Sequence, residues 1–291
     1  MRSAKIVPAA MLLAAAAFAP LAHAINVDAG DFEVAPPGTN VFLLYYQHAV
    51  SNDSYAQGNR TPGDPRLTTD IGILRAVHYM KLGSFIVAPQ VLLPFGRLDA
   101  GRDISALGSQ SGVGDMIFAF PVWFNEPGAK SQFSIAPYLI APTGQYSKNG
   151  ALNMGTNRWE FDLQAGYVQS LTDTISFDLV GDVQWNGNNT DYGSASQTLK
   201  QHNLYNLQTF LRYKFAPGAD LRIGLQQVSG GANFVDGVPQ NDRQSTNKFQ
   251  IGGSYFFSPK QQITATYGRD MSAHNGFKEA NRLNLRFLQI F

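Results

Sequence analysis

The sequence predicts an all-β protein: a transmembrane antiparallel up-and-down β-barrel of about twelve strands that follows an N-terminal signal peptide. Three observations lead to this prediction. Long segments alternate apolar with polar residues, short turns alternate with longer loops, and the N-terminus has the pattern of an export signal. Together they describe a sheet that is apolar on one face and polar on the other, in a protein that leaves the cytoplasm.

Residues 158–186 give the clearest strand pattern. Odd positions from Trp159 to Trp185 are mostly apolar, and the even positions between them are mostly charged or polar. A period of two indicates strands, and Thr172-Asp173 supplies a tight turn between them. Each strand is about ten residues or longer, against a usual length of about five or six. Such strands suit a barrel with lipid outside and a polar interior, although one hairpin alone fits a soluble β-sandwich equally well.

The N-terminus predicts the domain organisation. Arg2 and Lys5 precede an apolar stretch over residues 6–22, and Ala22-His23-Ala24 fits a cleavage site. We therefore predict a signal peptide over residues 1–24, an N-terminal periplasmic or lumen segment over 25–40, and the barrel over 41–291. After Ala24 the longest apolar run is about residues 117–124, which is far below the roughly 18 residues of a spanning helix.

Charge and cysteine content exclude several classes of function. Without Arg2 and Lys5 the chain keeps 20 basic residues against 21 acidic ones, which gives no case for binding nucleic acid. There is no cysteine, so an exported chain of this size needs a large core or a closed sheet in place of disulfides. No cofactor or metal site is expected, because no Cys/His metal spacing or phosphate-binding glycine loop is present.

The remaining strands follow the same rhythm. Twelve strands result, and five short turns alternate with six longer loops, as in bacterial outer-membrane barrels, whereas a sandwich gives no reason for this alternation. The predicted strands cover residues 41–49, 67–80, 85–95, 113–125, 132–143, 158–167, 175–186, 202–215, 220–229, 246–257, 262–271 and 280–291.

The last strand carries a second indication. Leu283, Leu285, Phe287 and Phe291 alternate with polar residues, which resembles the C-terminal signal that the barrel-assembly machinery recognises. Gln289 departs from that signal, where an aromatic or apolar residue is usual.

Aromatic residues collect near the predicted strand ends, as expected of two interfacial girdles. Trp159, Trp185 and Tyr205 fall on the loop side. Tyr79, Phe215, Phe257 and Phe291 fall on the turn side.

Charged residues of the polar face define the predicted lumen. Arg75 lies near mid-strand and would cost roughly 2–4 kcal/mol if it faced lipid, so we place it inside and His78 outside. The alternative to a solute path is that these charges only pair with one another. The candidate substrate-path residues are Arg75, Leu92, Tyr138, Ile140, Glu160, Asp162, Asp178, Asp182, Arg212, Arg222 and Arg286, and Lys214 and Arg282 are also expected to face the lumen.

Residues 85–143 differ from the rest because both faces of their strands are apolar. Ile86, Ala88, Leu92, Ile117, Ala119, Trp123, Tyr138 and Ile140 interleave with equally apolar neighbours. Pro89, Pro94, Pro121, Pro137 and Pro142 interrupt these strands, and proline cannot donate to a sheet ladder. Two interpretations remain open: an apolar wall with a kinked opening for a greasy solute, or a sector that packs on a loop or an N-terminal plug.

Catalysis is not expected. An outer-membrane hydrolase needs a histidine near a serine and an orienting residue, and only His274 has Ser272 and Asn275 close in sequence. They fall in a short external loop without a hydrolase motif, so no catalytic residue is assigned.

Two segments resemble a known family. They are Ile25 to Asn40 with Tyr45-Tyr46, and Ala141-Pro142-Thr143-Gly144-Gln145-Tyr146 with residues 153–161. The chain resembles, over nearly the whole mature sequence, the phenol meta-pathway degradation proteins, which are also described as transporters. The resemblance implies an outer-membrane protein linked to aromatic (phenol) degradation, and it brings no catalytic residues.

The sequence and the resemblance together favour an outer-membrane channel for passive uptake of small hydrophobic or aromatic compounds. Its expected partners are outer-membrane lipid, the barrel-assembly machinery and the solute. The alternatives are a structural or adhesive barrel that works through its external loops and, less favoured, an outer-membrane hydrolase.

Overall fold

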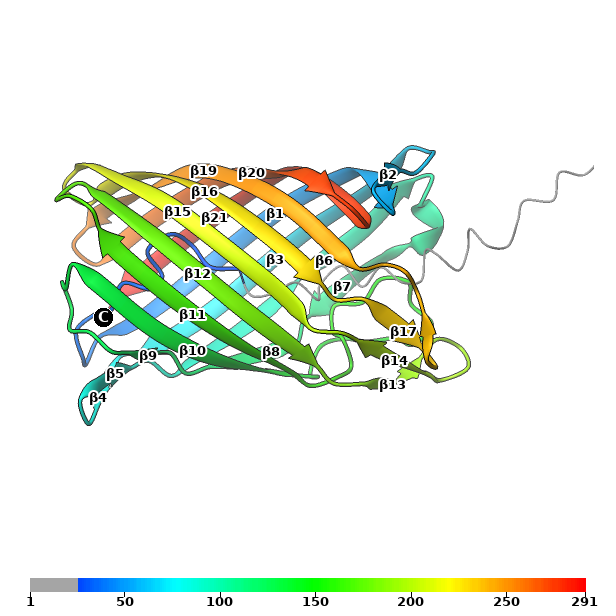
Figure 1. The fold of residues 1–291 in the computed structure, drawn as a ribbon, viewed down its shortest axis with the longest axis horizontal. Coiled ribbons are helices and arrows are strands. Elements are labelled where there is room, and N and C mark those ends of the chain that lie inside the picture. The colour runs from blue at the N-terminus through cyan, green and yellow to red at the C-terminus, as the bar shows by residue number, and fades with distance from the viewer. Residues whose placement is uncertain (1–25) are drawn as a thin grey trace, which may run out of the picture.

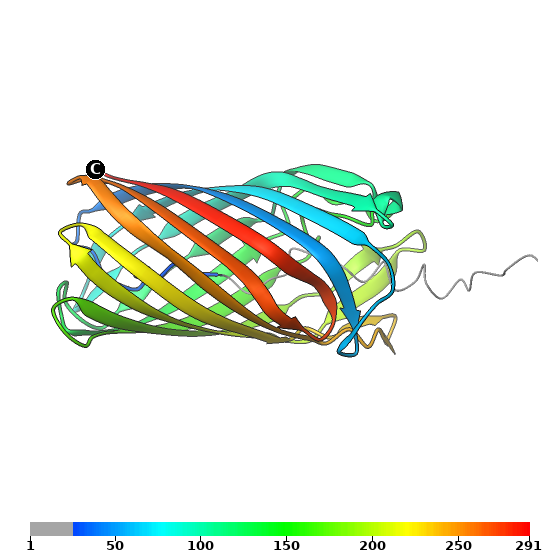
Figure 2. The ribbon, with the colours of Figure 1, turned by 90° about the horizontal axis from the view of Figure 1, so that it is seen from above.

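A computed structural model describes residues 26–291, so the predicted signal peptide lies outside the described residues. The chain forms one closed antiparallel β-barrel whose wall has twelve strands (Figures 1 and 2), which confirms the predicted fold. The wall elements are β1 (Asn40–Ala56), β3 (Pro65–His78) with β4 (Met80–Leu82), β5 (Phe85–Val87) with β6 (Gln90–Arg102), β7 (Ser109–Val113) with β8 (Met116–Ala119) and β9 (Val122–Trp123), β10 (Ser131–Ala141), β11 (Glu160–Ser170), β12 (Ile175–Asn186), β15 (Leu204–Ala216), β16 (Ala219–Gly230), β19 (Gln244–Ser258), β20 (Gln261–Ala273) and β21 (Gly276–Ile290).

The barrel closes between its first and last strands. β1 pairs with β21 from Val41↔Ile290 to Tyr55↔Gly276, and on its other edge it pairs with β3. The predicted hairpin has the expected register, with Gln164 opposite Asp182 in β11 and β12. Closure leaves no open edge, so every strand finds backbone partners within the hydrocarbon layer, where water cannot supply them.

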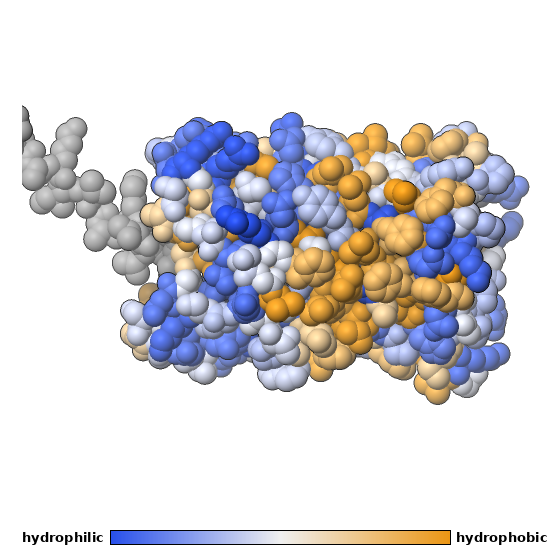
Figure 3. All heavy atoms as spheres, turned by 180° about the vertical axis from the view of Figure 1, so that it is seen from behind, coloured by the Kyte–Doolittle hydropathy of each residue, from blue (hydrophilic) through white to orange (hydrophobic). Residues whose placement is uncertain are grey.

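The two faces of the wall differ as the alternation predicts. Outward side chains such as Leu163, Leu207 and Ile251 are exposed. On the face of the barrel seen in Figure 3, apolar side chains gather across the middle of the wall. Inward side chains such as Gln164 and Gln208 are almost fully buried. Within residues 26–291 no helix is long and apolar enough to cross a membrane, and the only helix there is a short 3-10 turn, Ser105–Leu107.

Several loop predictions are wrong because the hairpins continue past the expected strand ends. Ser51–Ala56 was expected to start a long loop, but these residues extend β1 and pair with β21 as far as Gly276. β6 likewise continues to Arg102, where a loop from Gly96 was expected. The extension of β1 is mostly polar, so the apolar alternation ends there before the hydrogen-bonded ladder does. The extension of β6 still alternates, because Leu98 and Ala100 are buried between Arg97 and Asp99.

The longer loops between the wall strands form a second sheet that was not predicted. Its strands are β13 (Asn189–Tyr192), β14 (Gln197–Gln201), β17 (Asn233–Val235) and β18 (Val238–Pro239), and they lie beyond the loop end of the wall in Figure 1. β2 (Asn59–Arg60) extends the first hairpin at the same end. The turns at the opposite end are short, which is the periplasmic end in barrels of this type.

Candidate functional site

All eleven predicted path residues have their side chains inside the barrel. Ten of them are at least 92% buried, and the side chain of Arg75 is 14% exposed. Two other predictions are wrong. Lys214 is exposed at the turn end, and Tyr79, which was expected in the outer girdle, packs inside against Trp123 with ring centroids 5.5 Å apart. Tyr79 shares the parity of Arg75, which places its ring inside.

The segment before β1 folds back into the turn end of the lumen and plugs it. Asp31 accepts hydrogen bonds from Arg75 (3.1 Å) and Arg286 (2.7 Å), and Glu33 pairs with Arg212 at 2.8 Å. Arg75 and Arg286 belong to β3 and β21, which flank β1, so Asp31 bridges the place where the barrel closes. Truncating one partner of a buried pair typically costs about 3–5 kcal/mol, because the other charge is left unpaired.

Apolar contacts and backbone hydrogen bonds complete the attachment of the plug. The indole N–H of Trp123 donates to the carbonyl of Phe32 at 2.9 Å, and Gln132 accepts from the N–H of Val34 at 2.7 Å. The Phe32 ring lies on Gly166, where any Cβ would come within 2.2 Å of a ring carbon. A glycine at this point of β11 is therefore required for the plug to sit against the wall.

Carboxylates on β11 and β12 line one side of the lumen. Glu160 pairs with Arg158 at 2.8 Å and Asp178 with Arg212 at 2.9 Å. Asp182 accepts from Gln164 and Asn206, both at 3.0 Å. Asp162 is completely buried, and neither of its carboxylate oxygens has a hydrogen-bond partner within residues 26–291. Most predicted charges thus pair inside the wall, which was the alternative to a solute-selecting track.

A narrow polar cavity of about 70 Å³ lies beside residues 26–31 of the plug. Its polar lining comes from these plug residues and from β1, β3, β15, β16, β19, β20 and β21, and its apolar lining includes Leu92 and Tyr138. An engineered cavity of about 150 Å³ binds benzene, and a water molecule needs roughly 10–15 Å³. With the plug docked, this space accommodates several water molecules but no aromatic ring.

The loop end of the lumen is apolar. Leu67, Ile71 and Leu98 of the wall pack with Leu152 and Met154, which come from the loop between β10 and β11. Asp115 anchors that loop, since its carboxylate accepts from the N–H groups of Gly144 (2.8 Å) and Thr156 (2.7 Å). The sequence analysis did not identify this cluster, because the loop residues that complete it show no strand period.

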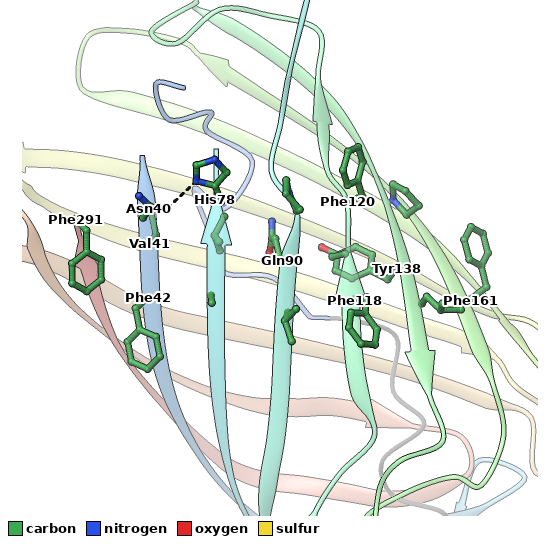
Figure 4. A pocket seen from close by; sticks show the side chains of 17 residues that line it. Asn40, Val41, Phe42, His78, Gln90, Phe118, Phe120, Tyr138, Phe161 and Phe291 are labelled. Carbon is green, nitrogen blue, oxygen red and sulfur yellow. Dashed lines mark hydrogen bonds between the residues drawn. The ribbon is translucent and has the colours of Figure 1, made fainter. Parts of the chain in front are cut away.

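A large apolar cleft opens in the wall near the turn end. Its volume is about 840 Å³, and Figure 4 shows Phe42, Phe118, Phe120 and Phe161 around it. These rings belong to the lipid-facing side of the barrel. Tyr138 and Gln90, which are buried lumen residues, also line the cleft. Tyr138 lines the central cavity as well, so one side chain borders both spaces.

Three prolines explain why the wall has fewer backbone hydrogen bonds beside the cleft. Pro89, Pro121 and Pro137 lie on adjacent strand segments, and each accepts one backbone hydrogen bond: from His78 (3.2 Å), Ala88 (3.0 Å) and Phe120 (3.0 Å) respectively. None can return a bond because proline has no N–H, so the usual two-way exchange is lost at three neighbouring positions. The prolines break the wall into β5 and β6 on one strand and β8 and β9 on the next. The predicted interruption is therefore seen at Pro89 and Pro121, whereas Pro94 and Pro137 lie inside the continuous strands β6 and β10. Pro89 and Pro137 line the cleft.

The candidate metal ligands and the residues around His274 complete the survey of residues 26–291. No group of three His, Cys, Asp or Glu residues there could hold a metal ion. Asn275 binds the loop backbone at Gln57 and Arg243, and Ser272 accepts from Asn247. The hydrogen bonds of Asn275 and Ser272 described here thus join them to residues other than His274.

A closed twelve-stranded wall with an apolar belt and a polar, plugged interior defines a bacterial outer-membrane β-barrel. Residues 51–287 match the family described as the MetA-pathway of phenol degradation, and the chain belongs to this family. An outer-membrane channel from Pseudomonas putida F1 is similar over 91% of this chain and 100% of its own, with 42% identity and a TM-score of 0.89. The predicted family and the predicted outer-membrane location are confirmed.

A more distant structure shares the architecture. The β-domain of the Bordetella autotransporter Brka is 10% identical over 88% of this chain and 100% of its own, with a TM-score of 0.51, which shows the fold alone. Among functionally curated proteins, none matches this chain. The similar structures are described as a channel and an autotransporter domain and not as enzymes.

The plug is expected to come loose in acid. Burial raises the pKa of Asp31, but Arg286 and Arg75 lower it further, so the net pKa lies below the ordinary value. A depressed pKa stabilises docking above the ordinary Asp value of about 4, and this contribution is lost as pH falls through the lowered pKa. With Trp159 and Trp185 replaced by Phe, the fluorescence of Trp123 should shift to the red below about pH 4.

Asp31→Asn provides the control, because its plug should show the acid-state emission already at pH 7. An emission spectrum that stays constant from pH 7 to pH 3 would contradict the role given to Asp31.

Proposed function

We propose that this protein is a passive outer-membrane channel for small hydrophobic or aromatic molecules, which leave the barrel through its wall. The observation that carries the proposal is the apolar cleft of about 840 Å³ whose inner side is formed by the lumen residue Tyr138. Binding sites for small molecules are usually concave and mostly apolar, with volumes of about 300–1,000 Å³. The cleft has these properties and faces lipid, where a hydrophobic solute is soluble.

A straight path through the barrel is less consistent with the dimensions. The central cavity of about 70 Å³ is roughly half the size that binds benzene. Passage toward the periplasm would also require the plug to leave Arg75, Arg212 and Arg286, and so to break several buried ion pairs at once. A sideways route leaves these ion pairs in place. It passes Leu92 and Tyr138, which line the central cavity, so the cavity must widen at these two side chains for a ring to reach the wall.

The proposed route has three stages. A solute first enters the apolar cluster around Leu98 and Met154 at the loop end. It then passes the wall residues Ile140, Leu92 and Tyr138, which are paired across neighbouring strands with the charged residues Glu160, Arg75 and Asp162. Finally it leaves between the broken strands into the leaflet near the turn end. No energy source is required, because degradation of the compound inside the cell maintains the gradient, as the family description implies.

Filling the cleft should slow uptake. Ala76 lies on the lipid-facing side of β3 and lines the cleft, so Ala76→Trp should reduce uptake of toluene several-fold by occupying the exit. The measurement is the initial rate of labelled toluene uptake into cells, with the rate of cells lacking the protein subtracted. Ala265→Trp on β20 places the same side chain at an exposed position outside the cleft and is the matched control.

Equal uptake by the two variants would argue against the wall exit. If the wild type shows no protein-dependent uptake, the proposal of a channel is contradicted and a structural or adhesive barrel is favoured.

We also propose that β21 carries the contact with the barrel-assembly machinery. The support is its outward row of Leu283, Leu285 and Phe287 beside the closing pair with β1. A photo-crosslinker at Leu285 should capture that machinery during biogenesis more strongly than one at Leu225 on β16. Equal capture from both positions would refute the proposal.

A further inference from the structure

Two carboxylates in the lumen lack a positive partner among residues 26–291. Asp162 on β11 and Asp182 on β12 both face inward, and the register of the two strands makes them diagonal neighbours. Both oxygens of Asp162 and the Oδ2 of Asp182 accept no hydrogen bond within that range. Tyr138, opposite Asp162 on β10, donates its hydroxyl to Gln164. Burying an ionised carboxylate alone is strongly unfavourable, so either a counter-charge or a proton neutralises this pair.

The neighbouring carboxylates on the same strands show what such a site contains. Glu160 pairs with Arg158 at 2.8 Å, and Asp178 pairs with Arg212 at 2.9 Å. Asp162 has no such arginine in the described part of the chain. Its side chain is completely buried, so no dissolved ion reaches it, and a counter-charge has to belong to the chain itself.

The plug runs along the inner face of β12 toward this pair. The N–H of Gly30 donates to Asp178 at 2.7 Å. Three residues earlier in the chain, Val27 packs against the apolar cluster that contains Val180, the next inward residue of β12. The inward residue after that is Asp182. A strand rises about 3.3 Å per residue, so Asp182 lies roughly 7 Å beyond Val180, a distance that two residues of extended chain span.

Asn26 joins the end of the described plug to the same carboxylates. Its side-chain oxygen accepts a hydrogen bond from Gln226, and Gln226 also donates to Asn206 at 3.0 Å. Asn206 in turn donates to Asp182 at 3.0 Å. Two wall amides therefore connect the first described residue with the acidic pair.

We propose that the positive partner of this pair is the α-amino group of Ile25, which becomes the first residue when the predicted signal peptide is cut after Ala24. An ammonium group has three N–H donors. The carboxylate oxygens of Asp162 and Asp182 that accept no hydrogen bond from the described residues are also three. This inference rests on the predicted cleavage site and is independent of the proposed function.

Cleavage changes the charge at exactly one nitrogen. In the precursor the nitrogen of Ile25 is an uncharged amide with a single N–H, which cannot neutralise a carboxylate. In the mature protein it is an ammonium. Docking of the plug end beside Asp162 therefore becomes favourable only after the signal peptide has been removed, and the lumen is completed after export.

Labelling of the α-amino group tests the ion pair. Mature protein purified from outer membranes is treated with acetic anhydride from about pH 6 to pH 10, then unfolded and cut at arginine. Residues 25–60 contain no lysine, so acetylation of this peptide reports the α-amino group alone. Only an uncharged amine reacts, and an ordinary α-amino group has a pKa of about 7.7–8.0.

The pH at which labelling reaches half its maximal rate distinguishes pairing from burial. Pairing with a carboxylate should move this pH about one unit or more above the ordinary value, whereas burial alone would move it below. Asp162→Asn should lower it by about one unit or more. Asp173→Asn makes the same change in the exposed turn between β11 and β12 and should keep the wild-type profile.

Two results overturn the proposal. Coinciding profiles of the wild type and Asp162→Asn would show that a proton neutralises Asp162. A first residue other than Ile25, found from the mass of the N-terminal peptide, would show that the predicted cleavage is wrong, and the ion pair would be lost with it. If Asp162→Asn does not assemble, Asp182→Asn takes its place, with a shift expected in the same direction.

Thermal unfolding decides the case in which the folded protein is not labelled at any pH. The midpoint is read from the loss of heat-modifiable mobility on gels. With the ammonium beside it, Asp162→Asn leaves a buried charge unpaired, and the midpoint should fall by several degrees. A midpoint that stays or rises would overturn the proposal, because it would show that no charge depends on Asp162.

Discussion

The double ion pair of Asp31 with Arg75 and Arg286 is the interaction on which the arrangement of the lumen depends. It joins β3 and β21 across β1, at the seam where the sheet closes, and it fixes the plug at the turn end. The two arginines could not remain inside a wall of this kind without a counter-charge, because burying an unpaired charge is costly. The plug therefore has an electrostatic role as well as a steric one: it neutralises the arginines that the barrel interior contains.

Fixing the plug has a consequence for the path of a solute. The lumen centre retains only about 70 Å³, while about 840 Å³ of apolar space lies outside the wall next to Tyr138. The wall between them is the part where Pro89, Pro121 and Pro137 have removed hydrogen bonds. The docked plug thus blocks the lumen along the barrel axis, whereas the wall beside Tyr138 has fewer backbone hydrogen bonds. This difference is the physical basis of the proposed lateral route.

The sequence was sufficient for the parts of the fold that depend on local alternation. The 158–186 hairpin, its register and the inward position of Asp162 and Asp182 follow from a period of two. The facing of residues 85–143 had weaker support in the sequence, because both faces are apolar and no parity separates Leu92 from its lipid-facing neighbour Val91. Leu92, Tyr138 and Ile140 nevertheless lie inside, where they were placed.

Partners distant in the chain were equally hidden. The acidic residues between positions 28 and 33 are evident in the sequence, but no local pattern connects Asp31 with Arg286. The sequence therefore predicted that the segment lies either in the periplasm or in the lumen and did not choose between the two.

The most direct test locks the plug in place. An ideal Cβ on Gly166 lies 2.3 Å from the Cγ of Phe32, so with one more bond of about 1.5 Å the two Cβ atoms are at most about 3.8 Å apart, and a disulfide forms if the plug adjusts to the usual separation of about 3.5–4.5 Å. The protein has no other cysteine, so Phe32→Cys/Gly166→Cys can form one defined bridge. If solutes leave through the wall, the oxidised double variant should take up toluene at the rate of its reduced form. Uptake that stops on oxidation and returns with a reductant would contradict the account and show that the plug must move.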